Sequence, residues 1–128
     1  MIDHMGLSVS DYSRAKQFYT QALAPLSITL MMEIPPEMAG GHNHAGFGAN
    51  GNPFFWIGTG KAASRNTHLA FAANSRAEVD RFHEAALAAG ATDNGAPGLR
   101  SHYHKDYYAA FVLDPDGNNI EAVCHRPE

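Results

Sequence analysis

Hydrophobic and polar residues alternate near the start of the chain and again near its middle. In residues 2–9, the apolar residues Met5, Leu7 and Val9 occupy every second position. Residues 67–73 show the same alternation. A period of two predicts two strands, each with one face buried and one face exposed.

A helical pattern follows each of these predicted strands. Residues 15–23 carry one stripe of apolar side chains, and Pro25 ends that helix. In the later segment, residues 75–78 (SRAE) form a capping box, and Gly90 stands where a glycine commonly ends a helix. Each half of the chain therefore begins with a strand and a helix.

The two halves match at an offset of 64 residues, which places His4 and His68 at the same point of an internal repeat. Further strands are predicted over residues 27–33, 44–49, 53–58, 107–113 and 119–125. The stretch after Gly90 is rich in Gly, Pro and Asn and is predicted to be a loop, so the second strand of the later copy is poorly marked. The order βαβββ, given twice, predicts an α+β fold with modules over residues 1–60 and 65–128.

Composition and charge restrict the kind of protein. The chain has 128 residues, enough for one compact domain, and a net charge of −4, which argues against a nucleic-acid surface. No apolar run approaches the roughly 20 residues of a membrane span, and the first residues lack the pattern of a signal peptide. The single cysteine excludes an internal disulfide framework, so we expect a cytoplasmic protein.

Three polar side chains stand out against the apolar alternation. His4 and His68 lie opposite the apolar faces of their strands, and Glu121 lies opposite Ile120 and Ala122 in the last one. Two imidazoles and a carboxylate are the ligand set of an open divalent-metal site. The alternative is that both histidines are hydrogen-bonded core residues and Glu121 forms a salt bridge.

Three motifs resemble the vicinal oxygen chelate superfamily of glyoxalases, bleomycin resistance proteins and extradiol dioxygenases. They are DHMGLSVSD at the start, THLAFAA in the middle and DPDGNNIEAV near the end, and the resemblance covers nearly the whole chain. It implies two βαβββ modules that form a U-shaped mixed sheet around a metal cleft, with the helices on the outer face. It further implies a divalent ion (Zn, Ni, Mn, Fe or Co) on His4, His68 and Glu121, and a small-molecule substrate. It also implies a homodimer, since single-domain members of the superfamily are usually dimers and some build each site from both subunits.

One position departs from the glyoxalase I pattern, in which the last strand of the first module supplies a fourth ligand. Aligning residues 51–55 with residues 117–121 places Phe55 there, and phenylalanine can neither bind a metal nor move a proton. The resemblance therefore implies a metal-dependent, glyoxalase-like enzyme of the lyase, isomerase or thiol-addition type rather than a true glyoxalase I. An Fe(II) ring-cleavage dioxygenase and an antibiotic-sequestering binding protein are the alternatives.

Other polar and aromatic residues are candidates for the walls of such a cleft. His102, His104 and Tyr108 can move a proton or donate to an oxyanion, and we assign them as catalytic candidates. Phe55, His44 and Tyr107 are candidates for substrate contact. For the aromatic residues the alternative is ordinary packing, and strand alternation alone does not decide which face of the sheet lines the cleft.

Overall fold

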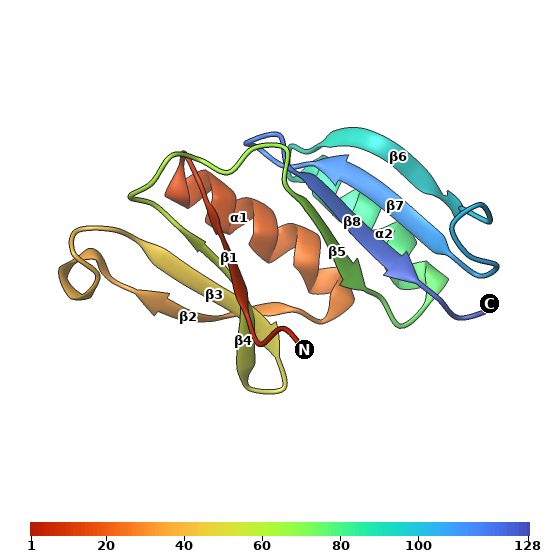
Figure 1. The fold of residues 1–128 in the computed structure, drawn as a ribbon, viewed down its shortest axis with the longest axis horizontal. Coiled ribbons are helices and arrows are strands. Elements are labelled where there is room, and N and C mark those ends of the chain that lie inside the picture. Colours follow the sequence, from red (N-terminus) through yellow and green to blue (C-terminus); the bar gives the residue numbers. More distant parts are fainter.

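The computed structural model describes all residues 1–128 and contains two four-stranded mixed sheets and two α-helices (Figure 1). The first module comprises β1 (Met5–Ser8), α1 (Tyr12–Leu23), η1 (Ala24–Leu26), β2 (Thr29–Ile34), η2 (Pro36–Met38), β3 (His44–Ala49) and β4 (Asn52–Gly58). The second comprises β5 (His68–Ala72), α2 (Arg76–Ala88), β6 (Thr92–Leu99), β7 (Tyr108–Leu113) and β8 (Asn119–Cys124). The predicted α+β class and the repeated βαβββ order are confirmed.

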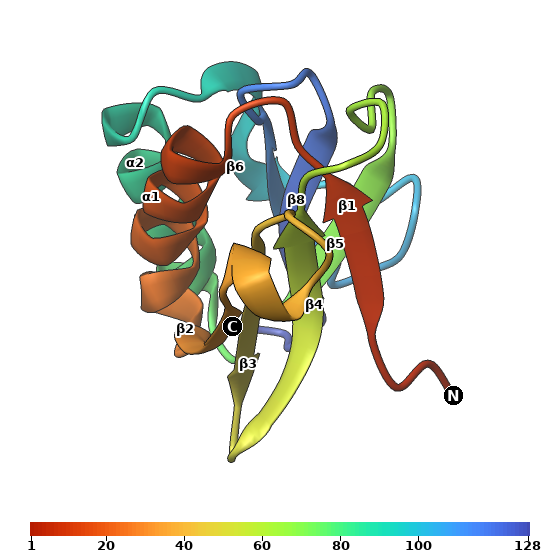
Figure 2. The same cartoon turned by 90° about the vertical axis from the view of Figure 1, so that its left-hand side faces the viewer.

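Each sheet has the same topology. The strand orders are β1-β4-β3-β2 and β5-β8-β7-β6, with one parallel pair, β1–β4 or β5–β8, at one edge and antiparallel pairing elsewhere. The two sheets lie side by side, and both helices pack on the same side of them (Figures 1 and 2). Each sheet therefore has one face covered by helix and one face, called here its open face, that turns away from the helices. Neither helix combines the length and apolarity that a bilayer span requires.

The core lies between the helices and the covered faces and runs through both modules. Tyr19 of α1 packs on Phe55 with ring centroids 4.9 Å apart, and Phe55 in turn packs on Phe71 of the second module at 5.4 Å. All three belong to one cluster of buried apolar residues that also includes Val79 and Phe82 of α2. Burial of this surface is the main favourable term that holds the two modules together.

A polar contact also joins the modules, at the turn between β7 and β8. The buried carboxylate of Asp114 accepts hydrogen bonds from the backbone of Asn118 and from the phenol of Tyr19 in α1. Asp116 accepts from the backbone and the hydroxyl of Ser10, just before α1. The DPDGN turn of the second module therefore holds helix α1 of the first module in place.

The helix starts follow the sequence signals. The side chain of Asp11 accepts from the backbone N–H of Arg14 at the start of α1. At the start of α2, Ser75 accepts from the backbone N–H of Glu78, and the carboxylate of Glu78 reaches back to the N–H of Asn74. The Ser75 half of the predicted capping box is formed, while Glu78 binds the N–H one residue before the N-cap.

The loop prediction after Gly90 is wrong, because Thr92–Leu99 forms the edge strand β6. Its pairing with β7 shifts register on both sides of Gly95, so the strand is irregular. A side chain at Gly95 would lie 3.0 Å from the ring of Phe111, and the φ of this glycine is +149°. Gly and Pro are tolerated at such a bulged edge, where fewer ladder hydrogen bonds are needed, and this is why composition indicated a loop.

Candidate functional site

His68 and Glu121 meet on the open face of the second sheet. The imidazole Nε2 of His68, at the start of β5, lies 3.1 Å from Oε1 of Glu121 in β8. The parallel pairing of β5 with β8 places Glu121 opposite Ala70, two residues beyond His68, so the two side chains project from the same face. The sequence pattern identified both residues, and the structure brings this pair together.

Hydrogen bonding fixes which nitrogen of His68 faces the carboxylate. Its Nδ1 lies 3.0 Å from the backbone oxygen of Asn119. A carbonyl oxygen only accepts, so Nδ1 carries a proton. Nε2 then faces Glu121 as a second N–H donor in the protonated ring, or in the neutral ring as a lone pair that a metal ion between the two groups would have to accept. The ring also stacks against Phe111, with centroids 6.3 Å apart. The imidazole is therefore held in one orientation, with Nδ1 toward Asn119 and Nε2 toward Glu121.

Glu121 has 1% of its surface exposed, and a buried carboxyl group needs hydrogen-bonding partners. Its second oxygen accepts a hydrogen bond from the phenol of Tyr107, which precedes β7. Burial, followed by the hydrogen bond to Glu121 and its negative charge, raises the pKa of Tyr107 to about 12. Near neutral pH Tyr107 is therefore a permanent donor that holds the carboxylate in place.

His4 lies apart from this pair, on the first module just before β1. Its Nδ1 lies 2.6 Å from Oδ1 of Asp3, and its side chain is 61% exposed. Within one chain, no three His, Cys, Asp or Glu side chains form a group able to hold a metal ion. The expected convergence of His4, His68 and Glu121 is therefore not found in a single copy, because the open faces of the two sheets lie next to each other instead of facing each other (Figure 1).

The strand register corrects the position assigned to the missing fourth ligand. Glu121 pairs with Ala70 in the second sheet, and the residue that pairs with Gly6, the repeat equivalent of Ala70, is Trp56. Phe55 points to the helix-covered side of its sheet and is 1% exposed, and it reaches only the bottom of the hollow between the modules, where it packs on Phe71. Tryptophan, like phenylalanine, does not bind a metal ion. The first sheet therefore has no carboxylate at the position equivalent to Glu121.

The three catalytic candidates, Tyr108, His102 and His104, make no contact with the His68–Glu121 pair. Tyr108 lies on the helix-covered face, where its phenol donates to Asp80 of α2, so it cannot act at the His68–Glu121 pair. His102 and His104 lie in the exposed loop between β6 and β7, where the ring of His102 packs on Tyr103, whose own ring contacts Tyr107. They lie near the pair but make no direct contact with it. His44, in contrast, shares one hollow of the first sheet with His4.

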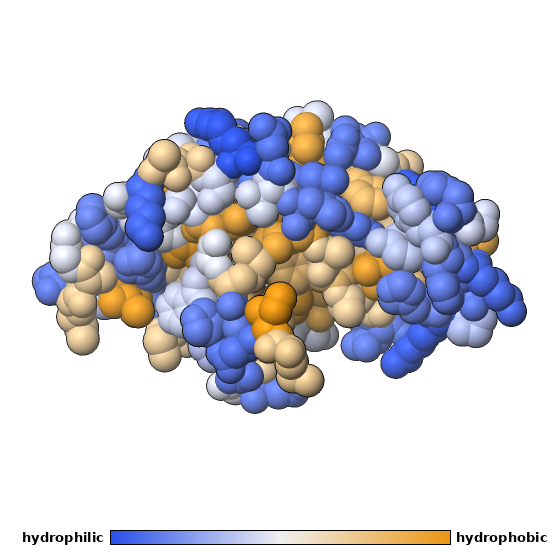
Figure 3. Space-filling model, in the orientation of Figure 1, coloured by the Kyte–Doolittle hydropathy of each residue, from blue (hydrophilic) through white to orange (hydrophobic).

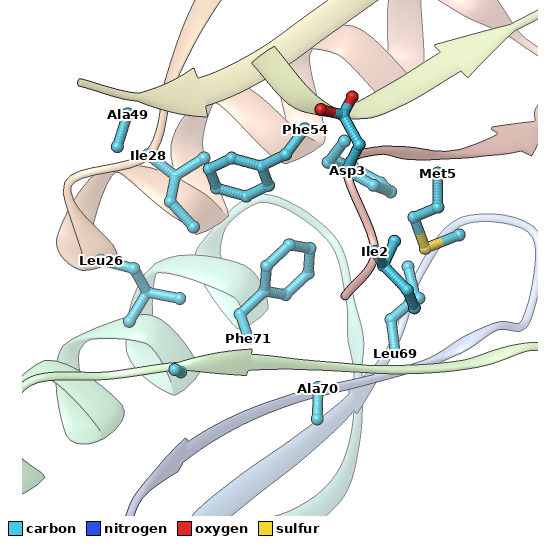
Figure 4. Close-up of a pocket in the computed structure, with 12 residues that line it drawn as sticks. Ile2, Asp3, Met5, Leu26, Ile28, Ala49, Phe54, Leu69, Ala70 and Phe71 are labelled. Atoms are coloured by element: carbon cyan, nitrogen blue, oxygen red, sulfur yellow. The ribbon is translucent and has the colours of Figure 1, made fainter. Parts of the chain in front are cut away.

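The most apolar hollow lies between the modules and has few polar side chains in its walls. It has a volume of about 380 Å³, and Phe54, Phe71 and Leu69 contribute to its walls (Figure 4). Asp3, the partner of His4, is the one ionisable residue that lines it. Apolar side chains gather along this boundary in the middle of the open side of the molecule (Figure 3). The polar candidates lie outside the hollow, on the two sheets that flank it.

Comparisons with known proteins agree with this fold. The family model described as "Glyoxalase/Bleomycin resistance protein/Dioxygenase superfamily" matches residues 1–122. A glyoxalase/bleomycin resistance protein from Albidiferax ferrireducens is 29% identical, with a TM-score of 0.73 and coverage of 98% of each chain. No functionally curated protein matches the chain.

More distant structures share the fold. Glyoxalase I from Zea mays is 20% identical with a TM-score of 0.72, and the match covers 99% of this chain but 45% of the maize chain. A fosfomycin resistance protein from Listeria monocytogenes, solved with Mn(II), is 18% identical with a TM-score of 0.68 over 96% of this chain and 88% of that chain.

Proposed function

The chain belongs to the Glyoxalase/Bleomycin resistance protein/Dioxygenase superfamily, and from this membership we propose that it is a divalent-metal-dependent, glyoxalase-like enzyme acting on a small oxygenated substrate. The observation that carries the proposal is the distribution of the donors. His68 and Glu121 form a ready pair on one open face, while His4 lies on the other sheet of the same copy. We propose that a second copy completes the site, so that His4 of one copy meets the pair of the other in a homodimer.

The geometry of the pair fits a shared metal ion. Nε2 of His68 and Oε1 of Glu121, 3.1 Å apart, are the two atoms of this sheet that would hold a divalent ion. Both histidines engage Nδ1 with an oxygen acceptor, Asn119 for His68 and Asp3 for His4, so in each ring Nε2 is the nitrogen that could bind a metal ion. Such outer-shell partners are the usual way in which a metal-binding histidine is oriented.

The residues around the pair support this chemistry. When bound, a divalent cation supplies Lewis-acid stabilisation of negative charge on a chelated substrate oxygen. Tyr107 holds Glu121 in its binding orientation and stays protonated while doing so. His102 and His104 remain our candidates for moving a proton, because their loop leads directly into Tyr107.

The three-donor set points away from glyoxalase I chemistry. Trp56 occupies the repeat position of Glu121, so the first module offers one imidazole and no carboxylate there. Lyase, isomerase and thiol-addition chemistry all fit such an open site. The Mn(II) in the fosfomycin resistance protein, which shares the fold, supports a divalent ion as cofactor. The chain covers less than half of the maize glyoxalase, so we transfer no activity from that enzyme.

Elemental analysis of untagged protein purified without chelator tests the proposal. We expect about one equivalent of a divalent metal per chain in the wild type, and much less in His68→Ala and Glu121→Gln. His42→Ala, which removes an exposed histidine outside the proposed set, should keep the metal. Light scattering should give twice the chain mass of 13.8 kDa. A wild type that holds no more metal than His68→Ala contradicts the enzyme proposal and favours a binding protein.

A further inference from the structure

We propose that Trp56 and His44 form a stacking surface, called here the ring platform, that binds a planar conjugated ring of the substrate. The inference deepens the proposed function, on which it rests, by naming a substrate class for the same site. Its first support is the position of Trp56, which lies in β4 directly opposite Gly46 of β3. A side chain added at Gly46 would meet three atoms of the indole's six-membered ring, at 2.8, 2.9 and 3.0 Å.

This contact shows how the indole lies. It occupies the space above Gly46 where that residue's own side chain would project, so the ring extends sideways over β3 rather than standing upright. One side of the ring system is therefore directed to the backbone of β3, and the other is directed away from the sheet. Only glycine leaves room for such an arrangement at position 46.

His44 repeats the arrangement in the opposite direction. It lies in β3 opposite Gly58 of β4, and a side chain at Gly58 would approach its Nδ1 to 2.5 Å. The imidazole of β3 thus lies over β4, while the indole of β4 lies over β3. Two flat rings, each lying over a glycine of the neighbouring strand, form a low surface on the open face of the first sheet.

The space above the ring platform is a binding hollow beside a proposed metal ligand. It measures about 330 Å³ and is lined by His4, Ile34, Met38, Ala39, His44 and Trp56. Its walls combine aromatic rings, aliphatic side chains and a thioether, and contain no carboxylate and no permanently charged side chain. Such walls favour an apolar, flat group, because aromatic faces stack and sulfur contacts ring edges favourably.

The two sheets differ at one equivalent position. The second sheet has the carboxyl group of Glu121 there, and the first sheet has the stacking surface of Trp56. His4 borders the same hollow. A substrate whose chelating oxygens are attached to a planar conjugated ring can therefore place its oxygens near His4 and its ring on Trp56.

A matched pair of acids tests the inference on the intact protein. The probes are 2-hydroxybenzoate and cis-2-hydroxycyclohexanecarboxylate, which carry the same oxygens on a flat and on a puckered ring. Equilibrium dialysis measures both affinities, because the flat acid absorbs light in the range used to excite Trp56. We expect the flat acid to bind about threefold to tenfold more tightly. Equal affinities, including no binding of either acid, overturn the proposal.

Three variants identify the surface responsible. Gly46→Ala forces the indole out of its position, and Trp56→Leu removes it, so both should lose the preference for the flat acid, measured by equilibrium dialysis. Gly6→Ala, whose new methyl group meets Trp56 only at ordinary contact distances of 3.6 and 3.7 Å, should keep it. An unchanged preference in Trp56→Leu overturns the proposal, even if Gly46→Ala fails to fold.

The metal proposal and the ring platform fail separately. His68→Ala removes a proposed metal ligand on the other sheet and leaves Trp56 untouched, so this variant should bind less metal but still prefer the flat acid. If no variant and no wild-type sample binds metal while the preference persists, the metal proposal is wrong and the ring platform stands. If metal binds and the two acids remain equivalent, the ring platform is wrong.

Discussion

A mixture of two defective variants tests whether the metal site is built from two copies. His4→Ala removes the donor of the first sheet, and His68→Ala removes a donor of the second. Each variant alone lacks one of the three proposed ligands in every site, so each should retain little tightly bound metal. The informative sample is a mixture in equal amounts, unfolded and refolded together so that copies exchange at random.

The expected recovery follows from the arrangement of the donors. In a symmetric homodimer, each of the two sites takes its first sheet from one copy and its second sheet from the other. A mixed dimer then has one site with both defects and one site with neither. Random pairing makes about half of the dimers mixed, so about a quarter of the wild-type metal content should return. A site within one copy would return none.

Elemental analysis after gel filtration measures the recovery, and a second mixture serves as control. His68→Ala mixed with Glu121→Gln carries both defects on the same sheet, so no mixed dimer contains an intact site. This control should recover no metal. Dimers that form in the first mixture without regaining metal would refute the shared site, and so would equal recovery in the two mixtures.

Three tyrosines provide further predictions. Tyr19→Phe should lower the free energy of unfolding by about 1–3 kcal/mol in urea titrations, because buried Asp114 loses a donor. Tyr12→Phe should be less stable than the wild type below about pH 10, and this difference should vanish toward pH 12. The reason is that the pKa of Tyr12 is raised to about 12 in the fold, so the protonated phenol stabilises the fold until it ionises. Tyr107→Phe should weaken Zn²⁺ binding about 10–100-fold in equilibrium dialysis, because Glu121 loses its orienting partner.

Tyr103→Phe is the common control for these substitutions. Tyr103 is 61% exposed, and its phenol makes no hydrogen bond within the chain, so stability and metal affinity should not change. A Tyr19→Phe variant as stable as Tyr103→Phe would contradict the role of the contact between the modules. A stability deficit of Tyr12→Phe that stays constant from pH 9 to pH 12 would contradict the raised pKa. Unchanged Zn²⁺ affinity in Tyr107→Phe would remove this residue from the metal site.

Alternation and repeat predicted most of the fold, because both depend on local sequence. The strand around His68, the capped helix after Ser75 and the final strand with Glu121 all lie where the pattern placed them. The parity argument also placed His68 and Glu121 on one face of one sheet. Composition failed at β6, since its bulged edge around Gly95 tolerates residues that are rare in regular strands.

The error at Phe55 has a specific structural cause. Between β3 and β4 the register shifts, so that Gly48 pairs with Pro53 but Phe47 pairs with Phe55, and Phe54 is the additional residue. Counting from the turn therefore places the repeat equivalent of Glu121 one residue too early. A slip of one residue reverses the face of every side chain, which moves the assignment from Trp56 on the open face to a buried ring.

The relation between the two sheets is what sequence parity could not supply. Parity assigns a side chain to a face, but it does not say whether two such faces meet. Under the proposed function, the open face of the second sheet binds the metal ion and the open face of the first sheet binds the substrate ring. Glu121 is a buried carboxyl group whose two oxygens lie against His68 and Tyr107, whereas Trp56 needs only the space that Gly46 leaves. A substrate bound between donors on one side and flat rings on the other requires these faces to oppose each other, and because they lie side by side within one chain, only a second copy can bring them together.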